Sequence, residues 1–197
     1  MTKQSSHVPP LDISAPPPVD HGLLGDIVFD ERQIGEAVAR IAAAVRRDYG
    51  GKPLVLIGVL KGAALFTADL MRALADYPLT VDFMVLSSYG TQLKSSGQVR
   101  LLKDLDYDPA GRDILLVEDI VDEGYTLAYL LNNMQSRHVS SVRSCSLLDK
   151  PFHRKVDVHA DYVGMAAPDA FLVGYGLDFQ ERFRNLPHIR TLLDSGT

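Results

Sequence analysis

The sequence predicts an α/β protein with a mostly parallel, twisted sheet flanked by helices. Short continuous apolar runs, such as "PLVLIGVL" at 53–60 and "DILLVEDIV" at 113–121, are typical of strands buried on both faces. Segments in which apolar residues recur with a helical period lie between such runs. This alternation is the pattern of α/β folds, whose ligands bind at the carboxyl ends of the strands.

The first predicted helix opens at Asp30 and ends at Gly50-Gly51. Asp30 can cap the free backbone N–H groups, and Gln33 occupies the reciprocal capping position. Apolar residues then recur with helical spacing at Ile34, Val38, Ile41 and Val45. The glycine pair ends the pattern because glycine adopts the left-handed conformation that terminates helices.

The remaining elements follow in the order that such a fold requires. A turn at Lys61-Gly62 leads to a helix at about 64–74, and strands are expected in "LTVDFMVLSS" and "RLLKDLD". Between these two strands, "YGTQLKSSGQ" is polar and too long for a tight turn, so a loop is predicted. After the strand at 113–121 come the helix "TLAYLLNNM" and the strands "VSSVRSCSLLD" and "DYVGMAA".

Length and composition limit the domain organisation and the class of partner. The chain has 197 residues, 46% of them hydrophobic and 23% charged, which fits one globular domain. Residues 1–22, rich in proline and serine, are predicted to form a flexible tail, and residues 23–197 a single domain. A formal net charge of −5 argues against nucleic acid or an anionic membrane as partner. No membrane helix or secretory signal is found, so a cytoplasmic protein is expected.

No catalytic or metal-binding role is predicted for the cysteine or the histidines. Cys145 lies in the apolar run "VRSCSLL", so a buried structural thiol is expected. The six histidines show no spacing typical of zinc ligands. His153 and His159 are therefore predicted to be surface or satisfied positions without a role.

The stretch "ILLVEDIVDEGYTL" at 114–127 contains the most informative polar residues. Glu118 and Asp119 stand at the end of a buried strand, and Asp122 precedes Gly124 and Thr126. Gly124 permits a positive φ or the close approach of a ligand, and a turn that opens a helix presents free N–H groups suited to a phosphate. The paired acids can accept hydrogen bonds from sugar hydroxyls, and magnesium can balance the remaining charge. A sugar phosphate such as ribose 5-phosphate fits both features.

This stretch resembles the phosphoribosyl pyrophosphate motif of the type I phosphoribosyltransferases. Five more segments resemble the hypoxanthine-guanine branch of that family: "VLKGA" at 59–63, "VDFMVLSSYG" at 81–90, "RLLKDLD" at 100–106, "SLLDKP" at 146–151 and "FLVGYGLDFQERFRNLPHI" at 171–189. The resemblance covers about residues 23–194. It implies a small hood formed by the chain ends, and a mobile lid loop that begins at Ser88 and Tyr89.

The resemblance also implies an activity in purine salvage. The phosphoribosyl group of phosphoribosyl pyrophosphate would pass to hypoxanthine or guanine, giving IMP or GMP and pyrophosphate. Mg²⁺ would be the cofactor, and the protein would be a homodimer or homotetramer. A phosphoribosyltransferase that prefers xanthine, and a nucleic-acid-binding regulator on the same fold, stay open as alternatives. The acidic net charge disfavours the regulator.

Individual residues take roles from the family motifs that they match. Asp122 would be the general acid/base, placed near N7 of the purine. Lys150 would donate to the 6-oxo oxygen, and Phe171 would stack on the base. The purine site would be formed by Lys150, Phe171, Leu172 and Asp178, and the metal site by Glu118, Asp119 and Asp178. Phosphoribosyl pyrophosphate would be bound by Lys61, Gly62, Glu118, Asp119, Asp122, Glu123, Gly124, Tyr125, Thr126, Leu127 and Arg184.

One position departs from the family motif. Residue 123 is Glu, where the family usually has a threonine or serine hydroxyl for the phosphate. Either the Glu123 carboxylate turns outward and backbone amides bind the phosphate, or phosphate binding is weakened. The sequence also leaves open whether the Lys61-Gly62 region contains the cis peptide found in the family.

Overall fold

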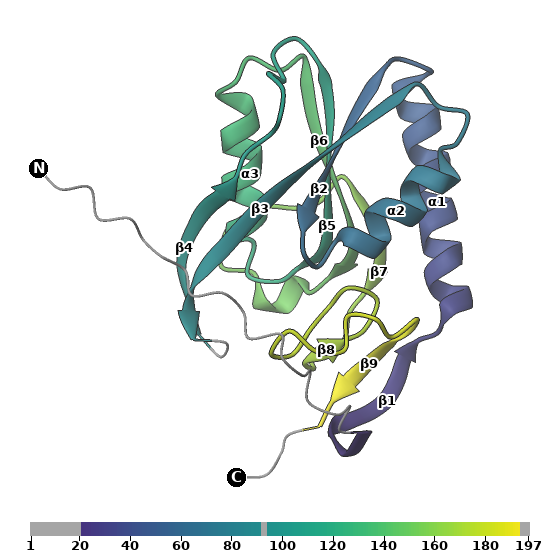
Figure 1. Ribbon diagram of the computed structural model, residues 1–197, viewed down its shortest axis with the longest axis vertical. Helices are drawn as coiled ribbons and strands as arrows, with labels where there is room; N and C mark the ends of the chain where they lie inside the picture. Colours follow the sequence, from purple (N-terminus) through teal and green to yellow (C-terminus); the bar gives the residue numbers. More distant parts are fainter. Residues whose placement is uncertain (1–20, 92–93, 194–197) are drawn as a thin grey trace, which may run out of the picture.

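The computed structural model describes residues 21–91 and 94–193, and these form two sheets (Figure 1). Within them, the larger sheet has six strands in the order β4-β3-β2-β5-β6-β7. These strands are β2 (Leu54–Leu60), β3 (Leu79–Thr91), β4 (Lys94–Lys103), β5 (Asp113–Val121), β6 (Ser141–Asp149) and β7 (Tyr162–Ala166). All neighbouring pairs run parallel except β3 and β4. The predicted fold class is confirmed.

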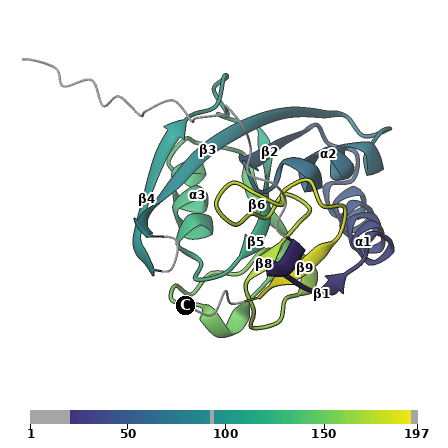
Figure 2. The same cartoon turned by 60° about the horizontal axis from the view of Figure 1, so that its bottom comes forward.

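Helices cover both faces of the larger sheet (Figures 1 and 2). On one face, α1 (Glu31–Tyr49) and α2 (Ala64–Ala73) pack against Leu54 and Leu56 of β2. On the other, α3 (Tyr125–Gln135) packs against Ile57 and Val59 of the same strand. Burial on both faces explains the continuous apolar runs in the sequence. Across the described ranges, no helix has the length and apolar character to span a bilayer.

The first helix begins and ends as its sequence predicts. The Asp30 carboxylate accepts a hydrogen bond of 2.7 Å from the Gln33 N–H, and the Gln33 side chain accepts one of 2.9 Å from the Asp30 N–H. This reciprocal pair satisfies two backbone donors at the helix start. Gly50 ends the helix in the left-handed conformation, at φ 59°.

The two ends of the described chain meet in a small hood, which lies below the larger sheet in Figure 1 and in front of it in Figure 2. Its three antiparallel strands are β1 (Leu24–Phe29), β9 (Ile189–Leu192) and β8 (Leu172–Val173). Leu24, Val173 and Phe183 form its buried centre. The predicted hood is confirmed. Of the predicted tail, residues 1–20 lie outside the described residues, and residues 21 and 22 begin the 3-10 helix η1 (His21–Leu23).

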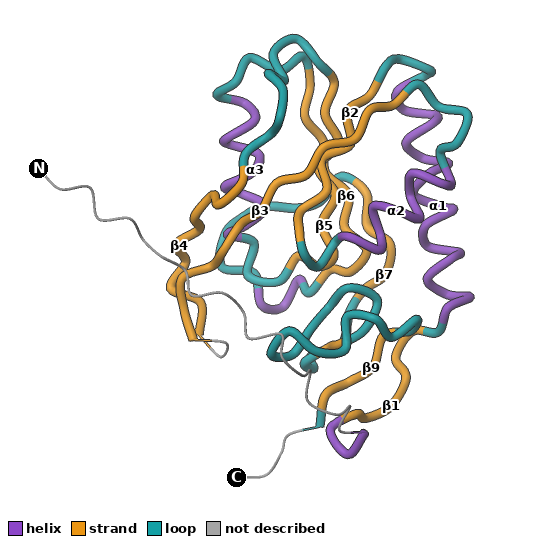
Figure 3. Tube along the Cα trace, viewed as in Figure 1, coloured by secondary structure: helices purple, strands orange, loops and turns teal. Residues whose placement is uncertain are grey.

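Residues 89–91 and 94–98 of the polar segment form strands and not the loop that the sequence predicts. Strand β3 continues to Thr91 and β4 starts at Lys94, and Figure 3 shows the two strands running together. Ser88 pairs with Val99, and Tyr89 with Gln98. Antiparallel pairing satisfies the main chain across the hairpin, so the segment needs no apolar anchor to remain extended. The side chains of residues 88–98, including those of Ser88 and Tyr89, lie outside the described part.

Candidate active site

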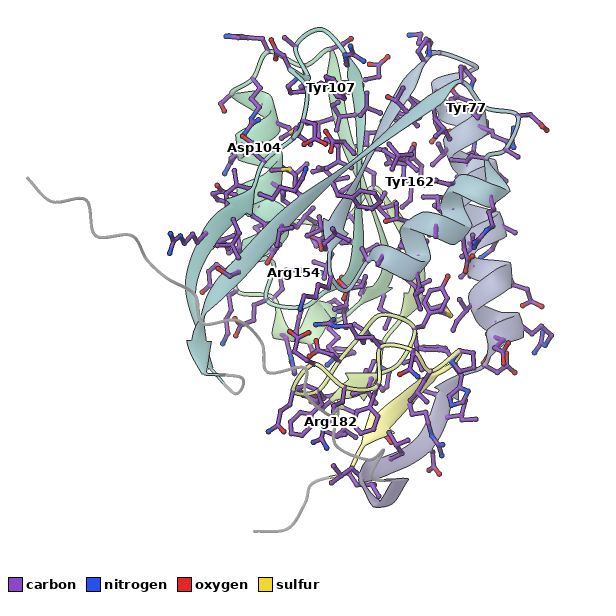
Figure 4. All side chains as sticks on the ribbon, viewed as in Figure 1. Tyr77, Asp104, Tyr107, Arg154, Tyr162 and Arg182 are labelled. Atoms are coloured by element: carbon purple, nitrogen blue, oxygen red, sulfur yellow. The ribbon has the colours of Figure 1, made fainter. Side chains whose placement is uncertain are left out.

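Four segments meet where the carboxyl end of the larger sheet faces the hood. They are the turn after β2, the end of β5 with the turn into α3, the segment after β6, and the hood loop that follows β8. Figure 4 shows Arg154, from the segment after β6, between the larger sheet and the hood. The candidate residues from the sequence lie in these segments, apart from Ser88 and Tyr89 in β3, Phe171 immediately before β8 and Leu172 at the start of β8.

The paired acids at the end of β5 are buried. The Glu118 residue is only 4% exposed, and its Oε1 atom lies buried without a hydrogen-bond partner among the described residues. Burial, and then the charge of Asp119, raise the pKa of Glu118 well above its usual value. Burial also raises the pKa of Asp119 to about 6. A hydroxyl donor or a cation supplied by a ligand would lower the free-energy cost of burying these carboxyl groups.

The turn after β5 has the geometry of a phosphate site. Gly124 is buried at φ 93°, and a Cβ atom there would come within 2.8 Å of the Val158 side chain. No side chain caps the start of α3. The first backbone N–H groups of that helix therefore have no partner within the helix and can bind an anion.

Glu123 contributes its main chain to the packing of this turn. Its carbonyl accepts hydrogen bonds from the N–H groups of Lys155 and Val156, at 2.9 and 3.3 Å. The segment that follows β6 thus lies against the turn. The backbone donors at the start of α3 do not depend on the Glu123 side chain, so both alternatives for that side chain stay open.

Asp122 and Lys150 lie together at the ends of the adjacent strands β5 and β6. Lys150 is 6% exposed, and its Nζ atom donates a 2.6 Å hydrogen bond to the Ala170 carbonyl. The same Nζ atom is 4.0 Å from Oδ2 of Asp122, whose side chain is 42% exposed. A buried cation thus stands beside an accessible acid.

Lys61 and Arg184, predicted to bind pyrophosphate, share one carboxylate. Oε2 of Glu181 lies 2.8 Å from Lys61 Nζ and 3.3 Å from a terminal nitrogen of Arg184. The hydrogen bond from Lys61 is the main cause that lowers the pKa of Glu181. Arg184 also pairs with Asp178 at 2.8 Å. Two cations of the predicted site therefore converge on the hood loop.

The turn after β2 contains a cis peptide bond between Leu60 and Lys61. It lies one position before the Lys61-Gly62 bond. Gly62 packs against the carboxylate of Asp119, and Gly176, at φ 99°, packs against the carbonyl of Gly62. Glycines at both positions allow three segments of the site to approach closely.

The predicted purine site combines an exposed ring with a buried strand. Phe171 is 43% exposed and contacts Phe179 edge to face, with ring centroids 5.8 Å apart. Leu172 is buried, and in β8 it pairs with Thr191. The ring of Phe171 is accessible to a planar ligand, while Leu172 can offer only its main chain.

The described residues hold no group of three His, Cys, Asp or Glu side chains that could bind a metal ion by itself. Glu118, Asp119 and Asp178 therefore do not form a complete protein site. Mg²⁺ usually keeps several waters and takes only one or two carboxylates besides substrate phosphates. The unpartnered oxygen of Glu118 and the adjacent acid Asp119 fit such a partial site.

Two residues near Asp122 carried no role in the sequence-based prediction. Arg154 donates a 2.6 Å hydrogen bond to the main-chain carbonyl of Asp122 and also binds the carboxylate of Asp149. His153 lies 2.9 Å from the Asp122 carboxylate, so this histidine is a satisfied position, one of the two predicted alternatives, and it also contacts the candidate site. Both follow Lys150 within four residues, at the carboxyl end of β6. Their position in the sequence, just after Lys150, could have indicated that both residues lie near the site.

A mostly parallel sheet whose carboxyl edge combines buried acids, a free helix start and converging cations fits the class of proteins that bind a phosphorylated sugar. Residues 25–180 match the family model described as phosphoribosyl transferase domain. The chain belongs to this family. The predicted family and enzyme class are confirmed.

Two curated relatives share one name. The hypoxanthine-guanine phosphoribosyltransferase of Bacillus subtilis (strain 168) is 48% identical over 166 residues, which cover 84% of this chain and 92% of the relative. The protein of the same name from Staphylococcus aureus (strain Mu50 / ATCC 700699) is 44% identical over 172 residues, 87% of this chain and 96% of the relative.

Solved structures agree with these relatives. A hypoxanthine phosphoribosyltransferase from Staphylococcus aureus has a TM-score of 0.82 at 44% identity and covers 88% of this chain and 94% of its own. The hypoxanthine phosphoribosyl transferase of Trypanosoma cruzi also has a TM-score of 0.82, at 42% identity, covering 89% of this chain and 95% of its own.

Proposed function

We propose that the protein transfers the phosphoribosyl group of phosphoribosyl pyrophosphate to hypoxanthine or guanine, giving IMP or GMP and pyrophosphate. The observation that carries this proposal is the pairing of Lys150 with Asp122, with Nζ 4.0 Å from Oδ2. A buried ammonium donates to a 6-oxo oxygen and disfavours the 6-amino group of adenine. The relatives named hypoxanthine-guanine phosphoribosyltransferase support the same substrates.

The phosphoribosyl pyrophosphate would lie along the carboxyl edge of β5. The N–H groups at the start of α3, from Gly124 to Leu127, would bind its 5-phosphate. The ribose hydroxyls would donate to Glu118 and Asp119. The buried Oε1 atom of Glu118 without a partner supports that role. Lys61 and Arg184 would bind the pyrophosphate.

Magnesium fits the same edge of the sheet. Glu118 and Asp119 would hold it, with Asp178 contributing through water. When bound, Mg²⁺ neutralises charge on the pyrophosphate and makes it a better leaving group.

The purine would rest on the exposed ring of Phe171, with its edge against the main chain of Leu172. Lys150 would fix the 6-oxo oxygen, and Asp122 would take the proton that the purine loses as N9 attacks the anomeric carbon. Such general acid/base catalysis contributes about 10²- to 10⁴-fold. Positioning and electrostatics supply the rest, and no covalent enzyme intermediate is needed.

The hairpin that contains Ser88 and Tyr89 would close over the site as a lid and exclude water from the transition state. We place the reaction in the cytoplasm and expect a homodimer or homotetramer.

Nucleotide formation from phosphoribosyl pyrophosphate, with hypoxanthine, guanine, xanthine and adenine compared, tests the proposal. Turnover of the first two is expected, with loss on chelation of Mg²⁺. Asp122→Asn lowers kcat by about 10²-fold or more. Asp76→Asn, an exposed acid at the opposite end of the sheet, is the matched control.

Other outcomes of this assay decide between the alternatives. Xanthine or adenine as best substrate would overturn the assignment of the base pocket. No turnover with any base, together with tight binding of nucleic acid, would establish the regulator instead.

A further inference from the structure

His153 lies between two carboxylates that come from different parts of the chain. It ends the 3-10 helix η2 (Pro151–His153), which follows β6 after Lys150. Its Nδ1 atom is 2.9 Å from Oδ1 of Asp122, and its Nε2 atom is 2.8 Å from Oδ1 of Asp169. An ionised carboxylate only accepts hydrogen bonds, so the imidazole ring is the donor in a hydrogen bond to either acid. The ring therefore links the turn after β5 to the segment that precedes β8.

The other contacts near Asp122 give the two carboxylate oxygens different surroundings. Oδ1 faces His153, whereas Oδ2 lies 4.0 Å from Nζ of Lys150. Arg154 binds the main-chain carbonyl of Asp122 and leaves its carboxylate available. Because 42% of the Asp122 side chain is exposed, packing alone does not fix its rotamer. The contact with His153 supplies an orientation that burial does not.

We propose that His153 is a positioning residue for the proton transfer by Asp122, an inference that rests on the function proposed above. The ring holds Oδ1 and thereby keeps Oδ2 on the side of Lys150, where the purine binds. Asp169 holds the far nitrogen, and contacts at both nitrogens fix the orientation of the ring. Without the imidazole ring, the Asp122 carboxylate stays in place but spends a smaller fraction of time pointing at the purine.

Three substitutions at position 153 separate the two contacts. His153→Asn keeps an amide N–H near the position of Nδ1, whereas His153→Gln places its amide near the position of Nε2. His153→Ala removes both. We expect kcat to fall about tenfold in His153→Ala and His153→Gln but only about threefold in His153→Asn, because misorientation forfeits part of a general acid/base contribution. The KM for phosphoribosyl pyrophosphate stays within about twofold, since its binding groups are unchanged.

A double variant tests whether the effect passes through Asp122. In an Asp122→Asn background, His153→Ala causes no further loss of kcat, because residues that act as one unit are not additive. His159→Ala is the matched control. That imidazole is 74% exposed, its partner is Asp157, and its loss leaves kcat unchanged. Melting temperatures identify any variant that is unfolded.

Each outcome decides the inference. A kcat for His153→Ala equal to that of the unsubstituted protein, or an additive loss in the double variant, overturns the positioning role. If His153→Ala does not fold, equal rates for the Asn and Gln variants overturn it. If the unsubstituted protein forms no nucleotide from any base, the proposed function fails instead, so the two failures are distinguishable.

Discussion

Gly62 packs so closely against Asp119 that a Cβ atom at position 62 would overlap the carboxylate. Gly62 lies in the turn after β2, and Asp119 lies near the carboxyl end of the neighbouring strand β5. The carbonyl of Gly62 is in turn covered by Gly176 of the hood loop. The absence of a side chain at Gly62 thus permits the turn after β2, the acid pair and the hood to meet.

Gly62→Ala is expected to damage both folding and activity. The added methyl must displace the Asp119 carboxylate, and such overpacking costs about 1–3 kcal/mol of unfolding free energy. Displacement of site groups by about 1 Å lowers kcat/KM by about 100-fold. Gly35→Ala is the control, because a methyl group added at Gly35 in α1 would meet no atom within 4 Å, and the change should stabilise by about 0.5–1 kcal/mol. Urea unfolding and steady-state kinetics measure both. Full activity in Gly62→Ala would contradict the close packing.

Asp119→Asn is expected to stabilise the ligand-free protein at neutral pH. Burial raises the pKa of Asp119 from 3.8 to about 6, so the native state binds its proton more tightly than the unfolded state. The stability from this carboxyl is fully present below about pH 4 and is lost as the pH rises through about 6. The loss amounts to about 3 kcal/mol above that pH. Asparagine carries no charge, so Asp119→Asn avoids this loss of stability.

Unfolding curves without magnesium, at about pH 4 and about pH 8, check this prediction. The stability gained by Asp119→Asn over the unsubstituted protein should appear at the higher pH and vanish at the lower. Asp76→Asn, at an exposed position, should show no such dependence. A gain that is equal at both pH values would mean that the charge of Asp119 is compensated in the folded protein.

The parts predicted from sequence are those with local signals. The capping box at Asp30 and Gln33 and the buried strand at 113–121 depend on residues close in sequence, and both are confirmed. Asp122 and Lys150 could be placed together because they follow strands expected in one parallel sheet. Lys150 matched a family motif as well.

The parts not predicted depend on contacts between distant residues. Arg190 donates to the Gly25 carbonyl across the hood, and no local period encodes that pairing of short strands. The contact of His153 with Asp122 requires a 3-10 turn after β6, and Asp169 reaches the ring from beyond β7. The hairpin at 88–98 was missed because its polar residues carry no strand alternation.

Lys150→Met is expected to lower kcat/KM for hypoxanthine and guanine by about 10- to 100-fold. A charge-assisted hydrogen bond to the 6-oxo oxygen is worth about 1.5–3 kcal/mol, and each 1.4 kcal/mol is about tenfold. Turnover of adenine should not fall, because its 6-amino group cannot accept that bond. Lys52→Met, at an exposed position before β2, is the control. Equal losses for all bases would show that Lys150 acts through structure and not through the 6-oxo group.

Glu181→Gln is expected to tighten pyrophosphate binding by about two- to fivefold. Oε2 of Glu181 holds both Lys61 and Arg184, at 2.8 and 3.3 Å, in a pair whose lysine side chain is 52% exposed. Removal of this negative charge frees two cations for the ligand and removes repulsion of an anion. Exposed pairs are worth about 0.2–1 kcal/mol, which limits the gain to a few fold.

Calorimetric titration with pyrophosphate measures the effect, which should shrink as salt is added because exposed charges are screened. Glu36→Gln, whose partner Arg32 lies on the surface of α1, should leave the affinity unchanged. Weaker binding by Glu181→Gln would show that the carboxylate holds Lys61 and Arg184 in the positions that the ligand needs. The two cations would then depend on Glu181 for their geometry, and the anion would bind beside this carboxylate and not in place of it.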